Sequence, residues 1–244
     1  MPVVGGTSVS KDMHRWLRYY RELQLEPYWI QVPLFDATQM QVVETWVPVI
    51  APHEWLHALH SRGPATWSRI MLGDNPPGVV LEWWEWALSQ PFGAVHPAAT
   101  DMSVLDEMFP LLFHYDGCES FTNQEAHIWS FGSAFGMGSC FDAKFIMLVL
   151  LNAQMPTADI QAGVHSRLCE FIGWSLKFCM SGKAPTDCFE HGAPFDERRR
   201  SLGGEWLAAG RRCRFGGLKM DRKAVHQVHG FRQHYQCGFV CESC

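Results

Sequence analysis

The stretch "FPLLFHYDG", residues 109–117, decides the fold class, because a short apolar run closed by Asp-Gly is typical of a β-strand that ends in a turn. Two more strands are predicted downstream, at residues 126–131 in "AHIWSFGS" and at residues 145–151 in "FIMLVLL". Apolar residues then recur at helical intervals over residues 161–180, before a polar loop over residues 181–204. "CRFGGLKMD", residues 213–221, predicts a fourth strand, and residues 222–231 predict a second helix. Three strands, a helix, a strand and a helix indicate an α/β fold.

The chain before residue 104 has a different pattern. Residues 1–10 are rich in Gly, Ser and Val and indicate a loose leader. Helical spacing of apolar residues then predicts a helical N-terminal region over residues 11–103, with helices at 11–26, 38–50, 65–72 and 79–89 and a short one that begins at Pro52. We therefore expect three parts: the leader, this helical region, and the α/β region over residues 104–244.

Composition limits the class of protein. Hydrophobic content of 47% and charged content of 18% are typical of a globular chain, and a net charge of -5 argues against a polybasic nucleic-acid binder. DNA stays open as a partner because positive charge gathers late in the chain, although a solvated surface is the commoner meaning of such a run. The basic residues concerned are Arg198, Arg199, Arg200, Arg211, Arg212, Arg214, Lys219, Arg222 and Lys223.

Cysteine usage and hydropathy bear on the compartment. The nine cysteines lack the regular spacing of a disulfide scaffold, and the N-terminus lacks the layout of a signal peptide. We expect reduced thiols in a nuclear or cytoplasmic protein that is not secreted. The longest apolar run, residues 145–151, is far shorter than the roughly 20 residues that a membrane helix needs, so no membrane partner is expected.

"HEWLHALH", residues 53–60, contains His-Glu-x-x-His, the signature of zinc proteases. On a helix, His53 and His57 would share a face and could bind zinc while Glu54 activates water. The surroundings fit poorly, because His60 and Gly63 do not match the extended forms of the motif and Pro52 puts His53 in a first helical turn. A zinc protease using these three residues remains an alternative.

Two aspartates carry the main hypothesis. In a ribonuclease-H-like fold the first and fourth strands are neighbours, so acids on them meet and hold Mg²⁺ for phosphodiester chemistry. Asp116 closes the first predicted strand and Asp221 closes the fourth. Taken singly, Asp116 also fits a hairpin turn and Asp221 a helix N-cap. Together with the strand order, they predict a ribonuclease-H-like domain with these two acids as catalytic Mg²⁺ ligands.

The last residues, "HQVHGFRQHYQCGFVCESC", have the spacing of a zinc site. Three thiolates and one imidazole would complete a tetrahedral structural Zn²⁺ site. The candidate ligands are Cys237, Cys241 and Cys244, with one of His226, His229 and His234. The alternative is a reduced tail without metal.

Several of these motifs resemble a known family. "PHEWLHAL", "EWW" followed by "HP", "FPLLFHYDG" and the block from Asp221 to Cys244 resemble the numerous transposase-like proteins encoded in dinoflagellate genomes. The family's usual His-Gly-Asp-Gly and Lys-Gly-Asp motifs stand here as His114-Tyr115-Asp116-Gly117 and Lys219-Met220-Asp221, so both acids are kept and both preceding glycines are replaced. If the family descends from DDE transposases, Asp116 and Asp221 match the first two of its three acids.

The resemblance also implies an expectation about the end of the chain. Family members continue past the last cysteines and supply a third acid, so we expect an incomplete ribonuclease-H-like domain that is inactive as it stands. The predicted function is therefore that of a transposase-derived protein related to metal-dependent DNA strand transfer. A zinc-stabilised interaction module without enzymatic activity is the main alternative.

Overall fold

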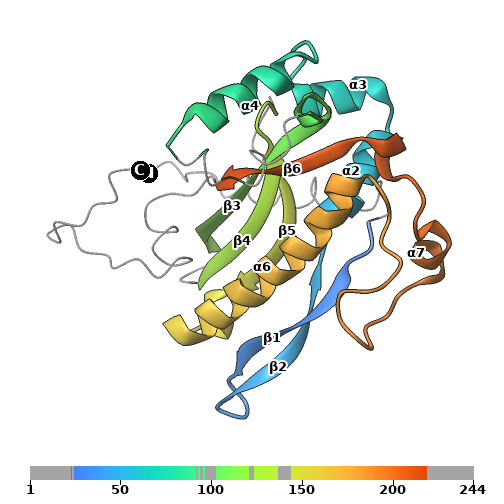
Figure 1. Ribbon diagram of the computed structural model, residues 1–244. Coiled ribbons are helices and arrows are strands. Elements are labelled where there is room, and N and C mark those ends of the chain that lie inside the picture. Colours follow the sequence, from blue (N-terminus) through green and yellow to red (C-terminus); the bar gives the residue numbers. More distant parts are fainter. Residues whose placement is uncertain are drawn as a thin grey trace, which may run out of the picture.

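The computed structural model describes residues 23, 25–91, 93, 96, 103–120, 124–136 and 144–218, and it has the predicted α/β class. Strands form a two-stranded sheet, β1-β2, and a four-stranded sheet in the order β5-β4-β3-β6. Helix α6 crosses one face of the larger sheet. Helices α3 and α4 lie at the end of this sheet that is far from the β1-β2 hairpin (Figure 1).

The helix predicted over residues 38–50 is wrong, because this segment forms a β-strand. β1 (Tyr28–Asp36) and β2 (Gln41–Val49) pair antiparallel along their whole length. Alternate β1 residues from Tyr28 to Leu34 are buried, as expected for a strand with one covered face. The Asp36 carboxylate accepts hydrogen bonds from the backbone N–H groups of Thr38 and Gln39, which stabilises the turn between the strands.

The other predicted N-terminal helices are present where the chain is described. α2 (Pro52–Ser61) begins with proline in its first turn, and α3 (Pro64–Trp67) continues directly into η1 (Ser68–Leu72). α4 (Val79–Ser89) has the bounds that its apolar spacing predicts. Most of the helix predicted over residues 11–26 lies outside the described residues, as does the leader over residues 1–10.

The larger sheet contains all four predicted strands. They are β3 (Met108–Ser120), β4 (Gln124–Ser133), β5 (Phe145–Leu151) and β6 (Arg212–Leu218). β4 pairs antiparallel with β3 and β5, whereas β6 runs parallel to β3. β3 is therefore a central strand with a partner on each side.

Asp116 and Gly117 do not form the turn that the dipeptide suggests. Both continue β3, with Asp116 opposite Ile128 and Gly117 opposite His127. A Cβ atom at position 117 would lie 2.3 Å from the Glu125 carboxylate. The glycine thus leaves room for the Glu125 side chain beside the strand.

α6 (Ala158–Ser181) confirms the helix predicted over residues 161–180 and covers the sheet. The Thr157 hydroxyl caps its first turn by accepting a hydrogen bond from the Ile160 N–H, and Gly182 ends it with a φ of 67°. Its buried face packs against β1, β6 and α2. The small hairpin and the larger sheet therefore share one helix.

Between α6 and β6 the chain is more ordered than the predicted loop over residues 181–204. It contains the short helix α7 (Glu197–Leu202), capped by Asp196, and the turn η6 (Leu207–Gly210). The last part of the predicted fourth strand, residues 219–221, and the helix predicted over residues 222–231 lie outside the described residues.

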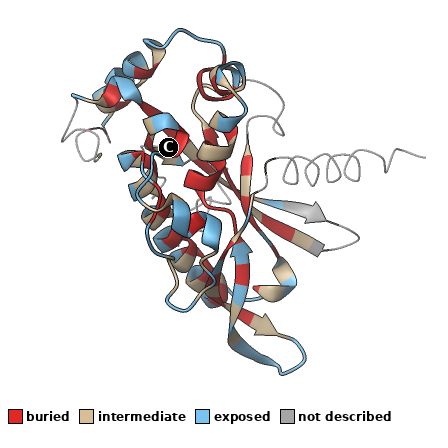
Figure 2. Ribbon diagram, turned by 90° about the vertical axis from the view of Figure 1, so that its right-hand side faces the viewer, coloured by how far each residue is buried: buried red, intermediate tan, exposed pale blue. Residues whose placement is uncertain are grey.

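A continuous buried cluster joins the segments on both sides of residue 104. The Trp55 indole in α2 packs on the Phe145 ring in β5, with ring centroids 5.0 Å apart, and donates a hydrogen bond to the Ile146 carbonyl. Buried positions gather where the sheet, α2 and α6 meet, and the tip of the β1-β2 hairpin is exposed (Figure 2). None of the helices that the structure describes is long and apolar enough to cross a membrane.

Candidate functional site

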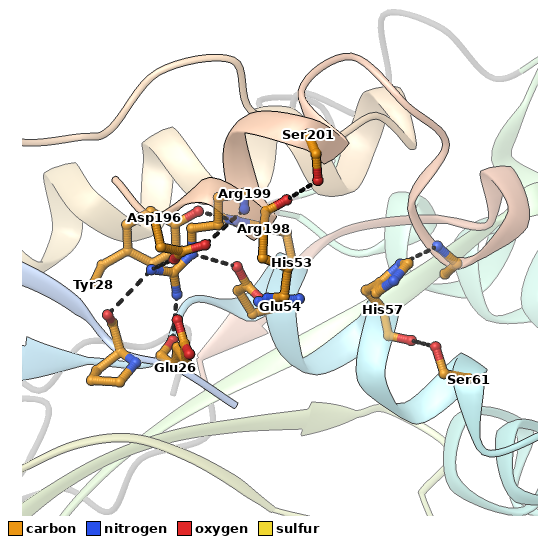
Figure 3. A network of polar contacts seen from close by, with 12 residues as sticks. Glu26, Tyr28, His53, Glu54, His57, Ser61, Asp196, Arg198, Arg199 and Ser201 are labelled. Atoms are coloured by element: carbon orange, nitrogen blue, oxygen red, sulfur yellow. Dashed lines mark hydrogen bonds and ion pairs between the residues drawn. The ribbon is translucent and has the colours of Figure 1, made fainter. Parts of the chain in front are cut away.

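The His-Glu-x-x-His segment lies in α2, with His53 and Glu54 in its first turn. This turn is buried, because β1, α6 and α7 converge on it (Figure 3). A first helical turn leaves backbone N–H groups without intrahelical partners, and the His53 N–H finds the Ser175 hydroxyl on α6. The motif is therefore part of the core.

Both ring nitrogens of His53 have protein partners. Nδ1 lies 2.8 Å from the Ser175 hydroxyl, and Nε2 lies 3.1 Å from the Tyr28 hydroxyl of β1. The rings of Trp174 and Phe178 pack on its sides. Burial lowers the pKa of His53 to about 4, so the imidazole is neutral at pH 7. Neither nitrogen is presented to a metal ion.

Glu54 is the centre of an ion-pair network. Its two carboxylate oxygens accept hydrogen bonds from Arg199 Nε at 2.8 Å and from Arg198 at 2.7 Å. Burial opposes ionisation of Glu54, but His53 and the two guanidinium groups lower its pKa below the ordinary value. A carboxylate held by two arginines cannot serve as the base that a zinc protease needs.

Arg199 is buried and has a partner on each side. Besides Glu54, its guanidinium donates to the carbonyls of Glu26 and Pro27 and pairs with Asp196, and it lies 3.9 Å from the centre of the Tyr28 ring. These contacts connect α7 to α2 and to the start of β1 (Figure 3). Part of the predicted basic run is therefore structural.

His57 lies one turn further along α2, half-buried, and its Nδ1 accepts a hydrogen bond from the Ala208 N–H at 3.3 Å. The cavity that Tyr28, His53, Glu54 and His57 help to line has room for about one water molecule. Within the described ranges, no group of three or more His, Cys, Asp or Glu side chains is placed to hold a metal ion. The arrangement of His53, Glu54 and His57 is that of a structural network, and it does not support the zinc-protease interpretation.

The surroundings of Asp116 differ from those of Glu54, whose carboxylate pairs with two arginines. It lies half-buried on central strand β3, and among the residues that the structure describes it has no ion-pair or side-chain hydrogen-bond partner. Its backbone pairs with Ile128 of β4, and the described pairing of β3 with β6 ends three residues earlier, at Phe113. A rigid backbone with a carboxylate that no cation neutralises is what a metal ligand needs. Asp221 lies outside the described residues.

The predicted zinc ligands near the end of the chain also lie outside the described residues. They are Cys237, Cys241, Cys244, His226, His229 and His234. The described part of the chain contains free thiols at Cys169, Cys179, Cys188 and Cys213, and those of Cys179 and Cys213 are buried. Burial raises the pKa of the Cys179 thiol to about 12, so it behaves as an apolar side chain.

Three polar contacts near Asp116 were not anticipated from the sequence. The Tyr115 hydroxyl lies 2.5 Å from His127 Nδ1, and His127 Nε2 lies 3.1 Å from the Asn152 side-chain oxygen. Lys144, which directly precedes β5, has its Nζ 3.2 Å from Nε2 of His114 on β3. Alternation along β3 puts Tyr115 and Asp116 on opposite faces of the sheet and His114 on the same face as Asp116. That alternation was the available signal that His114 lies on the same face as Asp116.

Comparisons with known proteins assign the chain to no family. No protein-family model matches it, and neither a curated protein nor a solved structure does. The functional assignment therefore rests on the residues and their geometry.

Proposed function

We propose that this chain is related to metal-dependent DNA strand-transfer proteins, with Asp116 and Asp221 as metal ligands in a ribonuclease-H-like domain. The observation that carries this proposal is the spatial order of the larger sheet, β5-β4-β3-β6. Along the chain, three antiparallel strands, β3, β4 and β5, are followed by α6 and then by β6, which runs parallel to β3. A ribonuclease-H-like domain needs this order, because only a fourth strand beside the first brings the two acids to the same place.

The register of the parallel pair supports the assignment of these two acids. Phe113 on β3 pairs with Leu218 on β6. Asp116 and Asp221 each come three residues after that pair. If both strands keep this register, the two carboxylates leave neighbouring positions on one face of the sheet.

The chemistry of the donors fits Mg²⁺. Mg²⁺ prefers carboxylate oxygens, and Asp116 has no cationic partner among the described residues, whereas Glu54 is neutralised by arginines. Bound Mg²⁺ would activate a water or 3′-hydroxyl for attack on a DNA phosphate. The protein's part is to hold the Asp116 backbone in its pairing with Ile128 of β4, which fixes the point from which the carboxylate leaves the sheet. The resemblance of the strand motifs to transposase-like proteins agrees with this chemistry.

The test is to locate a bound metal. Fe²⁺ that replaces Mg²⁺ reduces added hydrogen peroxide to hydroxide and a hydroxyl radical, and added ascorbate returns the Fe³⁺ to Fe²⁺. The radical cleaves the backbone next to the site. We expect fragments that end near Asp116 and near Asp221, and we expect excess Mg²⁺ to suppress both. Asp116→Asn and Asp221→Asn should each remove both cleavages, because the two residues share the ion.

Asp106→Asn is the matched control, since Asp106 is exposed in the 3-10 turn before β3. It should leave the cleavage pattern unchanged. Cleavage at only one of the two aspartates, or equal cleavage in the Asp116→Asn protein, would refute the shared site.

A further inference from the structure

His114, Asp116 and Lys144 gather on one face of the larger sheet. His114 and Asp116 are two positions apart on β3, so their side chains leave the same face. Lys144 directly precedes β5, and β4 separates β5 from β3. The Lys144 side chain therefore crosses β4 to reach His114 Nε2, at 3.2 Å.

Small residues on β4 make this crossing feasible. His114 pairs with Ser130, and Leu112 pairs with Gly132. A bulky side chain at either β4 position would occupy the path of the lysine stem. The hydrogen bond then holds the Lys144 ammonium group beside His114, which shares a face of β3 with Asp116. Lys144 itself directly precedes β5.

The electrostatics of this contact favour an anion. Because the ammonium group donates to Nε2, His114 is a neutral imidazole with its proton on Nδ1. Across the described segments, no carboxylate pairs with Lys144, whereas the half-buried Arg167 and the buried Arg199 both have acidic partners. An ammonium group has three N–H donors, and the contact with His114 uses one of them. A half-buried cation with no carboxylate partner in these segments is suited to bind an external anion.

We propose that Lys144 binds a backbone phosphate of the DNA strand on which Asp116 acts, and that His114 is the residue that positions it. This inference rests on the proposed function and adds a substrate contact to it. Lysine suits the role because its ammonium group binds phosphate as a point charge from many directions. His114 accepts from Lys144 without neutralising it, which an acidic partner would do.

The test is the salt dependence of DNA binding by the full chain, measured by fluorescence anisotropy with a labelled oligonucleotide in Ca²⁺. Each phosphate contact contributes about 0.7 to 0.9 to the slope of log K against log salt. We expect Lys144→Met to lower the slope by that amount and Lys144→Arg to keep it. Lys177→Met, at an exposed position of α6, is the matched control and should keep the wild-type slope.

The role of His114 has its own variants. His114→Leu cannot accept from Lys144, so we expect the same loss of slope although the lysine is present. His114→Gln offers a carbonyl acceptor and should restore the slope. The double variant His114→Leu/Lys144→Met should have the same slope as Lys144→Met alone, because the two substitutions remove the same phosphate contact.

The outcomes separate this inference from the proposed function. Calorimetric Mn²⁺ binding that depends on Asp116, together with an unchanged slope in Lys144→Met, would overturn the phosphate contact and leave the metal site standing. A lowered slope without Mn²⁺ binding would keep the phosphate contact and refute the metal site. Wild-type protein that does not bind DNA would overturn the inference directly.

Discussion

The Glu54 carboxylate lies 2.8 Å from the Arg199 guanidinium, and this buried ion pair joins α2 to α7 across 145 positions of the chain. Both side chains are at least nine-tenths buried. Removing one partner of such a pair leaves the other charge buried and without its counter-charge.

We therefore predict that Glu54→Gln lowers the free energy of unfolding by about 3 to 5 kcal/mol. The amide keeps the size of the side chain but leaves Arg199 without its main counter-charge. Urea unfolding followed by circular dichroism measures the change. Glu44→Gln, at an exposed position of β2, should change stability by less than about 0.5 kcal/mol. An equally small loss in Glu54→Gln would show that the ion pair contributes nothing to the fold.

The two arginines that contact Glu54 should differ in importance. The Arg198 side chain is 41% exposed and that of Arg199 is 5% exposed. Solvent screens the outer pair, so we predict a loss of at most about 1 kcal/mol for Arg198→Met. Arg199→Met should cost several times more, because it also ends the contacts with the Glu26 and Pro27 carbonyls and the Tyr28 ring. Equal losses in the two variants would contradict this order.

The same network explains which part of the site could be predicted from the sequence. His-Glu-x-x-His was recognisable because its four residues of spacing are local. Arg199 and Ser175, which determine what Glu54 and His53 do, lie more than a hundred positions away. No local pattern indicates such partners, so the motif suggested zinc chemistry and the structure shows a core ion pair.

The fold shows a similar division. α4 was predictable because the turn-forming stretch "GDNPPG", residues 73–78, precedes it and its apolar residues have helical spacing. At and just before β2, the spacing of Met40, Val43 and Trp46 also fits a helix, and only pairing with β1 makes residues 41–49 a strand. The order of the strands and of α6 along the chain was predictable because each is a distinct segment of the sequence. That β6 lies beside β3 was expected only from the ribonuclease-H-like interpretation, because it depends on pairing between distant segments.

Acid should destabilise the protein through His53. Its pKa falls from 6.5 in the unfolded chain to about 4 in the folded one, because burial penalises the charged form. The unfolded state therefore binds more protons between these values, and stability decreases as the pH falls through that window. The expected loss is about 3 kcal/mol by the lower end.

Urea unfolding at closely spaced pH values measures this loss. His53→Gln should be less stable at pH 7, where it lacks the full set of contacts, but it should show a shallower dependence on pH. His191→Gln, at an exposed position before α7, serves as the control and should keep the wild-type profile. A steep dependence that survives in His53→Gln would assign the acid sensitivity to another group.

A glycine at position 209, in the turn before β6, should remove backbone strain and stabilise the protein. Ala209 is exposed and has a φ of 53°, a left-handed conformation that costs alanine roughly 1–2 kcal/mol. We predict that Ala209→Gly stabilises the protein by about 0.5 to 1 kcal/mol, since glycine adopts this conformation without a steric penalty but gains freedom in the unfolded chain. Thermal unfolding should show a small rise in Tm. Ala162→Gly, at an exposed position inside α6, should have the opposite sign, and a destabilising Ala209→Gly would disprove the strain.

The contact between the Tyr115 hydroxyl and the His127 ring should contribute to the stability of the fold. Tyr115→Phe removes the hydroxyl that lies 2.5 Å from His127 Nδ1 and leaves a buried nitrogen without this partner. The expected cost is about 1 to 3 kcal/mol in urea unfolding. The double variant with His127→Leu should recover part of that loss, because no buried polar atom of the pair is then left and the half-buried Asn152 can turn to water. Losses that simply add in the double variant would mean that the two side chains do not interact, and the short distance would then reflect packing alone.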